Sequence, residues 1–169
     1  MKYLKLTLSI ALTGFIHLNL NAQQMSSPNH GQLVFEKLIY HSGHCNGACP
    51  QIDLEIDSNN NVLLKREFWK GKGVIDNHRS GNFKGKIEPK TYFSLITTLI
   101  ASNYIDMKFP PVFCCDAPIT TIIIYANGKR TYLSSMTPPE NAHRLIASLY
   151  DLATKLEIPS TSEEIKLEN

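Results

Sequence analysis

The sequence predicts an α+β domain in which an antiparallel sheet of about six strands carries two helices packed on one face. Short segments that alternate between apolar and polar residues, or are rich in β-branched residues, indicate the strands. The connections between these segments are short, which favours antiparallel pairing. Two further segments carry apolar residues at helical spacing. The expected order of elements is therefore β-β-β-β-α-β-β-α.

The first three strands are expected to include a hairpin. Residues 33–41 are rich in apolar side chains, and residues 51–57 alternate strictly, so that their three apolar residues share one face. The run Ser58–Asn61 consists of residues that tolerate left-handed backbone and bond to their own backbone. Residues 62–69 are therefore expected to return as the second arm.

A glycine-spaced loop over residues 71–81 leads to a short fourth strand over residues 82–87. Glu88-Pro89 then opens the first helix, because proline is favoured at the first helical position. Asn103 is the expected stop. The apolar face of this helix consists of Tyr92, Phe93, Ile96, Leu99 and Ile100.

The C-terminal part of the domain is expected to be a hairpin followed by a helix. Residues 119–125 form an apolar, β-branched strand, and Asn127-Gly128 is the strongest hairpin signal in the chain. Residues 130–135 form the return arm. Thr137-Pro138-Pro139-Glu140 is typical of a capping box with a proline at the first helical position. The helix that follows has an apolar face of Ala142, Leu145, Ile146, Leu149, Ala153 and Leu156.

The domain organisation is expected to be simple. Residues 1–22 are typical of a signal peptide, with Lys2 and Lys5 before an apolar run and a small residue at the end. Residues 23–32 form a polar flexible leader, residues 33–158 a single domain and residues 159–169 a frayed polar tail. The protein is therefore expected to be exported, periplasmic or secreted, with no transmembrane segment once the signal is cleaved.

Charge and motifs exclude several classes of function. Two of the 17 basic residues lie in the signal, which leaves 15 against 15 acidic residues. This balance argues against a nucleic-acid partner. The sequence contains no nucleophile-elbow serine, no phosphate loop and no isolated pair of carboxylates. We therefore assign no catalytic residues and expect a non-enzymatic protein.

All four cysteines, Cys45, Cys49, Cys114 and Cys115, lie in the mature region, where an even number argues for pairing. Three connectivities are possible. A Cys45–Cys49 bridge closes a short loop and would stabilise the folded protein by about 2 kcal/mol, whereas a Cys45–Cys114 bridge would stabilise it by about 4 kcal/mol. A bridge between the adjacent Cys114 and Cys115 is strained, which leaves that pair free, buried or reactive.

Four segments carry a resemblance to a known family: Cys45-Asn-Gly-Ala-Cys49-Pro50, residues 81–87, Asp116-Ala-Pro with Thr120-Thr121, and Asn127-Gly-Lys129. The first fits a Cys-x-Gly-x-Cys-Pro pattern. On the basis of these segments, the stretch from about Leu33 to Ile158 resembles an exported bacterial family of unknown function, DUF6438.

The resemblance implies an envelope or secreted location and no established activity. It also favours the local Cys45–Cys49 bridge, because relatives manage without the second cysteine pair. Gly47 fits a tight ring of this kind, since glycine adopts backbone geometries closed to other residues. The chain departs from the family at Gln51, where an aromatic residue is common, and at Cys114-Cys115, which is an addition.

A metal or redox site is the alternative interpretation of the same loop. Cys45, Cys49 and Pro50 resemble the thiol pair of thioredoxin-like copper chaperones, in which a distant histidine, here His143, completes a copper(I) site. In those proteins the pair begins a helix, whereas here a strand follows. A zinc site from His41, His44, Cys45 and Cys49, with Cys114 or Cys115 recruited, is a further possibility. The simpler interpretation leaves His41, His44 and His143 facing solvent.

Phe68, Trp69 and Asp116 are candidates for a binding surface. The two aromatic residues end a strand beside the glycine-spaced loop, and Asp116 stands between the second thiol pair and a proline. Packing and turn formation are the simpler roles for these residues. Taken together, the sequence predicts a binding or structural module that presents a disulfide-shaped loop to a protein or envelope-surface partner. No cofactor is expected, copper or zinc being the alternative.

Overall fold

The computed structural model describes residues 33–45, 49–71, 73–111 and 116–168. The expected signal (1–22) and leader (23–32) lie outside these residues. Within the described part, the elements follow in the order β1 (Phe35–Ser42), β2 (Gln51–Asp57), β3 (Asn61–Glu67), β4 (Trp69–Gly71), β5 (Val74–Ile75), β6 (Gly81–Lys86), α1 (Pro89–Ala101), β7 (Thr120–Ala126), β8 (Lys129–Ser135), the 3₁₀ turn η1 (Glu140–Ala142) and α2 (His143–Lys155).

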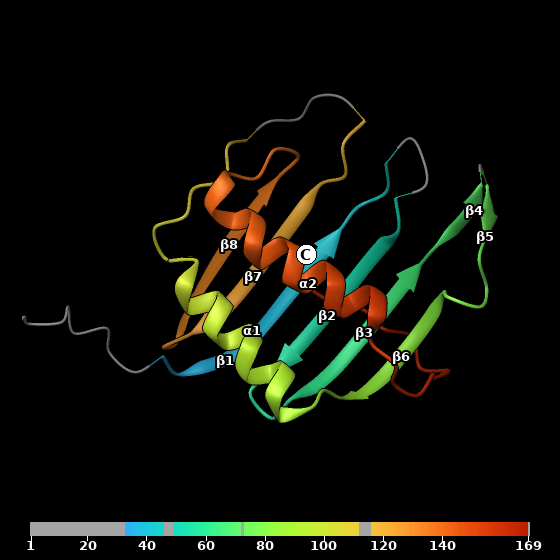
Figure 1. Ribbon diagram of the computed structural model, residues 1–169, viewed down its shortest axis with the longest axis horizontal. Coiled ribbons are helices and arrows are strands. Elements are labelled where there is room, and N and C mark those ends of the chain that lie inside the picture. The colour runs from blue at the N-terminus through green and yellow to red at the C-terminus, as the bar shows by residue number, and fades with distance from the viewer. Residues whose placement is uncertain (1–32, 46–48, 72, 112–115, 169) are drawn as a thin grey trace, which may run out of the picture. The chain divides into compact units, whose positions relative to one another are not determined.

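Six strands form one antiparallel sheet in the order β6-β3-β2-β1-β7-β8, and both helices cover the same face (Figure 1). This confirms the predicted α+β class. β1 is the strand that joins the two halves of the sheet, because it pairs with β2 on one side and with β7 on the other. The ribbon β4–β5 forms a separate two-stranded sheet.

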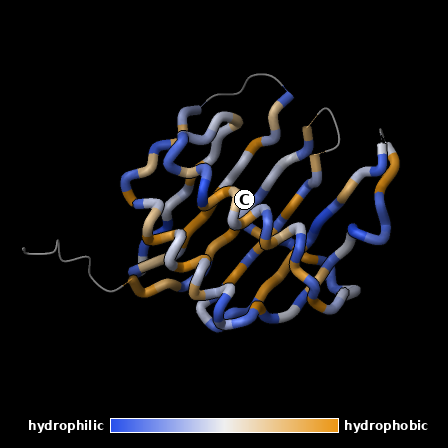
Figure 2. Tube along the Cα trace, viewed as in Figure 1, coloured by the Kyte–Doolittle hydropathy of each residue, from blue (hydrophilic) through white to orange (hydrophobic). Residues whose placement is uncertain are grey.

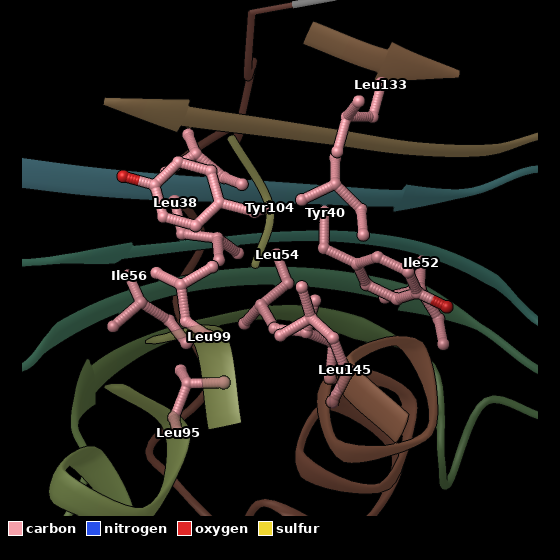
Figure 3. Packing of buried hydrophobic residues seen from close by; sticks show 14 of the residues in the cluster. Leu38, Tyr40, Ile52, Leu54, Ile56, Leu95, Leu99, Tyr104, Leu133 and Leu145 are labelled. Atoms are coloured by element: carbon pink, nitrogen blue, oxygen red, sulfur yellow. The ribbon is translucent and has the colours of Figure 1, made fainter. Parts of the chain in front are cut away.

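The core lies between the sheet and the two helices. Leu95 and Leu99 of α1 and Leu145 of α2 point towards Leu54 and Tyr40 of the sheet (Figure 3). All five side chains are at most 4% exposed, and each such burial contributes about 1.5–3 kcal/mol. Along β2 apolar and polar residues alternate, so that Ile52, Leu54 and Ile56 all face the core, whereas β7 is apolar over most of its length (Figure 2).

The turns follow the sequence signals closely. Asn60, Asn103 and Asn127 have φ values of 64°, 49° and 54°, and Gly128 has a φ of 68°. Asn127-Gly128 therefore forms the expected two-residue turn between β7 and β8, in which both residues have positive φ. Pro89 is the first residue of α1, as predicted.

The third strand is shorter than predicted. β3 ends at Glu67, because the backbone N–H of Phe68 donates to Ser80 Oγ at 2.8 Å instead of continuing the ladder. The chain then forms the β4–β5 ribbon, which begins at Trp69, the last residue of the predicted strand, and extends into the predicted loop of residues 71–81. This ribbon places Trp69 opposite Ile75.

The capping box predicted at Thr137–Glu140 is wrong. α2 begins at His143 after η1, and no side chain caps the start of either element. The second proline explains the difference, because a residue that precedes proline is disfavoured in helical backbone. Pro138 cannot therefore begin the helix, and Pro139 is itself extended, with a φ of −69° and a ψ of 157°.

The C-terminal end of α2 is held by an arginine of the sheet. Arg66 Nη1 donates to the carbonyl oxygens of Ala153 at 2.7 Å and Leu156 at 3.2 Å. Ala153 lies in the last turn of α2 and Leu156 is its C-cap residue, where the helix supplies no further backbone donor. Arg66 therefore fixes this end of the helix on β3.

The C-terminal segment, residues 159–168, is not the frayed tail expected from its polar composition. It runs along the outer edge of β6, where Lys84 N donates to Pro159 O at 3.1 Å and Thr161 N donates to Asn82 O at 2.9 Å. Ser160 forms an isolated antiparallel bridge with Phe83. In Figure 1 this red segment lies beside β6. We call residues 159–168 the C-terminal strap.

Candidate functional site

The cysteine loop joins β1 to β2 and is closed by a disulfide. Cys45 and Cys49 are bonded, with their Cα atoms 5.5 Å apart. Pro50 follows and is buried, and β2 begins at the next residue. Gly47 lies outside the described residues, as do Cys114 and Cys115. The local pairing favoured by the resemblance is therefore the pairing that the structure contains.

The cysteine loop and the segment that precedes β7 emerge from the same end of the sheet. β2 and β7 are each antiparallel to β1, so they run parallel to each other with β1 between them. Gly43 N, just beyond β1, donates to Ile119 O at 2.8 Å and ties the two connections together. The starts of β2 and β7 are thus separated by one strand at a common end of the sheet.

A pocket of about 460 Å³ lies at this end of the sheet, between the cysteine loop and α2. Its apolar wall includes the disulfide residue Cys49 with Pro50, Pro118 and Ile146. Hydroxyl groups from the sheet and polar side chains from α2 complete the lining. The full lining is Tyr40, Ser42, Cys49, Pro50, Pro118, Thr120, His143, Ile146, Ala147, Tyr150 and Asp151.

Tyr40 is the most buried of the polar residues that line the pocket, with 1% of its surface exposed. Burial raises the pKa of Tyr40 to about 12, against the smaller, lowering effect of its hydrogen bond with Ser42. The phenol is therefore neutral at physiological pH. It can donate and accept hydrogen bonds, but it cannot act as a base there.

His143 opens α2 and lines the same pocket as Cys49 and Pro50. Its side chain is exposed, as expected, and Nε2 lies 3.2 Å from Pro138 O. Because a carbonyl oxygen only accepts, Nε2 carries the proton in this contact. His143, Cys49 and Pro50 thus line one pocket, and of the residues on which the copper interpretation depends only Cys45 is not in its lining.

The other two candidate histidines, His41 and His44, point elsewhere. His41 follows Tyr40 in β1 and lies on the opposite face of the sheet, where Nδ1 is 2.8 Å from Asp53 Oδ1. The ring of His44 packs against that of Trp69, with centroids 5.2 Å apart. The proposed metal set of His41, His44, Cys45, Cys49 and His143 is therefore divided between separate places. In the described part of the chain, no three His, Cys, Asp or Glu residues are grouped to hold a metal ion.

Phe68, Trp69 and Asp116, the candidates for a binding surface, also lie in different surroundings. Phe68 is 6% exposed and lies beneath the guanidinium of Arg79, 3.7 Å from the ring centroid, so it is a packing residue. Trp69 is half-buried, and its indole Nε1 has no hydrogen-bond partner among the described residues. Asp116 is exposed in a turn. Of the three, Trp69 is the one that the structure connects to the cysteine loop, through His44.

Several residues that line the pocket, Ala147 and Tyr150 of α2 among them, were not predicted as site residues. On α2 they recur at helical spacing with His143 and Ile146, which the sequence had singled out for other reasons. That stripe is visible in the sequence beside the apolar face. Tyr40, Ser42 and Thr120 carried no comparable signal, because their position depends on the pairing of β1 with β7.

The fold and site define a class, namely a small antiparallel α+β domain with a disulfide-closed loop beside an apolar pocket. The chain belongs to the family described as "Domain of unknown function (DUF6438)", whose model matches residues 36–157. No curated protein matches the chain. Among the described residues, neither helix is long and apolar enough to cross a membrane.

Proposed function

We propose that the protein is an exported, non-enzymatic module that binds its partner at the pocket beside the disulfide-closed loop. The observation that carries the proposal is the convergence of three separate segments on one pocket. The cysteine loop, the approach to β7 and the first half of α2 all contribute lining residues. A mostly apolar pocket with a few hydroxyl groups is the usual form of a binding site.

The disulfide gives this site its shape. Cys49 and Pro50 form part of the wall, and the bond to Cys45 limits how far that wall can move. The partner expected at such a site is a protein or envelope surface that offers an apolar group to the wall and a polar group to Tyr40 and Thr120. Export rests on the signal-like residues 1–22 and is supported by the disulfide, which persists in oxidising compartments.

The experiment is photo-crosslinking from the pocket. A benzophenone amino acid at Ala147, which lines the pocket, should give a discrete crosslinked product in the envelope fraction of producing cells. The same group at Arg144, which is exposed on α2 but does not line the pocket, should not. Replacing Cys45 and Cys49 by serine should abolish the Ala147 product and cost about 2 kcal/mol of stability.

Two results would contradict the proposal. One is an identical set of products from both positions. The other is thiol oxidoreductase turnover by the intact protein, which would make the disulfide a reactant.

A redox or metal-handling function is the second candidate, because His143 lines the same pocket as Cys49. It requires the two cysteines to be reduced, since a thiolate is the nucleophile and the metal ligand. Alkylation of the exported protein without prior reduction, followed by intact and native mass spectrometry, separates the two functions. Unmodified Cys45 and Cys49 with no bound ion support the binding module, whereas alkylated thiols or retained copper or zinc support metal handling.

A further inference from the structure

The face of the sheet opposite the helices is covered by the C-terminal strap. After pairing with β6, the chain passes to this face, where the Lys84 ammonium lies 2.8 Å from a carboxylate oxygen of Glu163. Asn82 Nδ2 also donates to Glu163 O at 3.1 Å. Ile165 is then 8% exposed, although its neighbours in the strap are exposed. The strap thus has one polar and one apolar anchor before it reaches its end.

Glu168 is the third anchor, and it contacts three residues of the central and outer strands. Arg130 Nε donates to Oε1 at 2.7 Å, and the Tyr125 hydroxyl donates to Oε2 at 2.5 Å. The backbone carbonyl of Glu168 accepts from His41 Nε2 at 2.7 Å. One acidic residue is therefore recognised through its side chain and its backbone together, which is a specific arrangement.

The residues of the sheet that contact the strap lie within the part of the chain that matches the family, whereas the strap lies outside it. The match to the family ends at residue 157, while Asn82, Lys84, His41, Tyr125 and Arg130 all lie within it. The polar anchors of the strap are also partly exposed: the side chains of Lys84 and Glu163 are 54% and 66% exposed, and those of Arg130 and Glu168 are 39% and 36% exposed. Ion pairs of this kind contribute about 0.2–1 kcal/mol each, so the strap can be exchanged.

We propose that this face of the sheet is a binding site for an extended acidic peptide of a partner protein, which the chain's own strap occupies in the free protein. The recognised features are a glutamate held by Arg130 and Tyr125, an aliphatic residue three positions before it, and an acidic residue near Lys84. The pairing with β6 adds backbone hydrogen bonds, as in other proteins that take up an extended peptide at a sheet edge. The site is independent of the pocket beside the cysteine loop, which lies on the helix-covered side.

The test uses the full-length chain and a fluorescent peptide with the sequence of residues 158–169. In the wild type the strap competes with the peptide, so the apparent affinity is reduced by the fraction of molecules whose site is open. A chain with Ile165→Ser and Glu168→Gln has a weakened strap and should bind the peptide at least about tenfold more tightly by anisotropy. Glu164→Gln is the matched control, because the Glu164 carboxylate is paired with Lys166 inside the strap, and this variant should bind the peptide as the wild type does.

Two further variants locate the site. Adding Arg130→Gln to the weakened-strap chain should reduce peptide binding at least about fivefold, through loss of a charge-assisted contact. Lys129→Gln, an exposed neighbour, should not. A peptide that itself carries the Ile165→Ser and Glu168→Gln changes should not bind.

The proposal is overturned if the weakened-strap chain binds the peptide no better than the wild type, or if Arg130→Gln leaves binding unchanged. A concentration-dependent dimer that Glu168→Gln dissolves would also overturn it, because the strap would then belong to a second copy. If the double variant melts well below the wild type, Glu168→Gln alone replaces it in the same assay. A single substitution at the exposed end of the strap leaves Ile165 in place.

Discussion

The two faces of the sheet are built from the same strands but held by different forces. On β1, Leu38 and Tyr40 point into the core beneath the helices, while Ile39 and His41 point to the opposite face. The helix-covered face is a continuous apolar surface. The strap-covered face has charged and aromatic residues around a small apolar centre, where Ile39 lies opposite Ile123 and both are fully buried.

The difference indicates where the stability of the domain lies. Hydrophobic burial under two helices contributes far more than a strap held by one apolar side chain and exposed polar contacts. The helix-covered face should therefore open only when the domain unfolds, whereas the strap-covered face should open locally at a lower free energy.

The largest effect is expected from Leu145→Ala, which removes a fully buried side chain between α2 and the sheet. We expect a loss of about 3 kcal/mol in the free energy of unfolding, because the cavity cannot be filled by helices packed on a rigid sheet. Urea denaturation measures it. A loss below about 1 kcal/mol would show that the helix-covered face is more adaptable than proposed.

Arg66→Met should lower the free energy of unfolding by about 2 kcal/mol, because it leaves the carbonyl groups of Ala153 and Leu156 without their charged donor. Methionine keeps most of the aliphatic stem, so the loss reports the contacts of the guanidinium, which also lies 4.6 Å from the centroid of the Phe83 ring. Arg79→Met is the control: Arg79 lies over Phe68 at 3.7 Å, and its loss should cost less than about 1 kcal/mol. Equal effects from the two variants would contradict the role assigned to Arg66.

On the strap-covered face, Ile165→Ala should lower the free energy of unfolding by only about 1 kcal/mol, although the side chain is buried, with 8% of its surface exposed. The cost cannot exceed the free energy with which the strap docks, since a weakened strap simply detaches. Hydrogen exchange should show faster exchange at Lys84 N and Thr161 N, with no change in β1. A loss as large as that of Leu145→Ala would make the strap part of the core.

The smallest effect concerns pH and His41. Burial of the ring lowers the pKa of His41, but hydrogen bonds to the Asp53 carboxylate and the Glu168 carbonyl outweigh burial, so the pKa is raised overall. The stability that this proton contributes is fully present below the ordinary value of about 6.5 and is lost as the pH rises through the higher folded value.

Thermal denaturation of the wild type should therefore show lower stability at about pH 8 than at about pH 6. His41→Gln should reduce this dependence of stability on pH. A slope of the opposite sign in the wild type would mean that His41 is neutral when the strap is docked.

The sequence was sufficient for most of the fold because its signals are local. Strict alternation placed β2 at Gln51–Asp57, and Asn127-Gly128 placed the turn between β7 and β8. The capping box failed because Pro139 restricts Pro138, an interaction between neighbours that outweighed the favourable pattern of Thr137 and Glu140.

The candidate site was less predictable because it depends on strand order. Cys45 and Cys49 could be paired through a resemblance, but the place of His143 beside Cys49 requires knowing that α2 crosses the sheet at that end. The strap was missed for a related reason. Its polar sequence is typical of a frayed end, and the groups that hold Glu168 lie far away in the chain, on β1, β7 and β8.

The pairing of β1 with β7 also bears on how the chain folds as it is made. Leu38 lies opposite Ile124, which is 86 positions later in the chain, so the pairing of β1 with β7 closes a long loop. Contacts between residues so far apart in the sequence slow folding. β1, β2, β3 and β6 can pair before β7 has been synthesised, but the outer edge of β1 then has no partner. An unpaired edge of this kind can recruit another nascent chain. Timely arrival of β7 is therefore the step on which productive folding, as opposed to aggregation, depends.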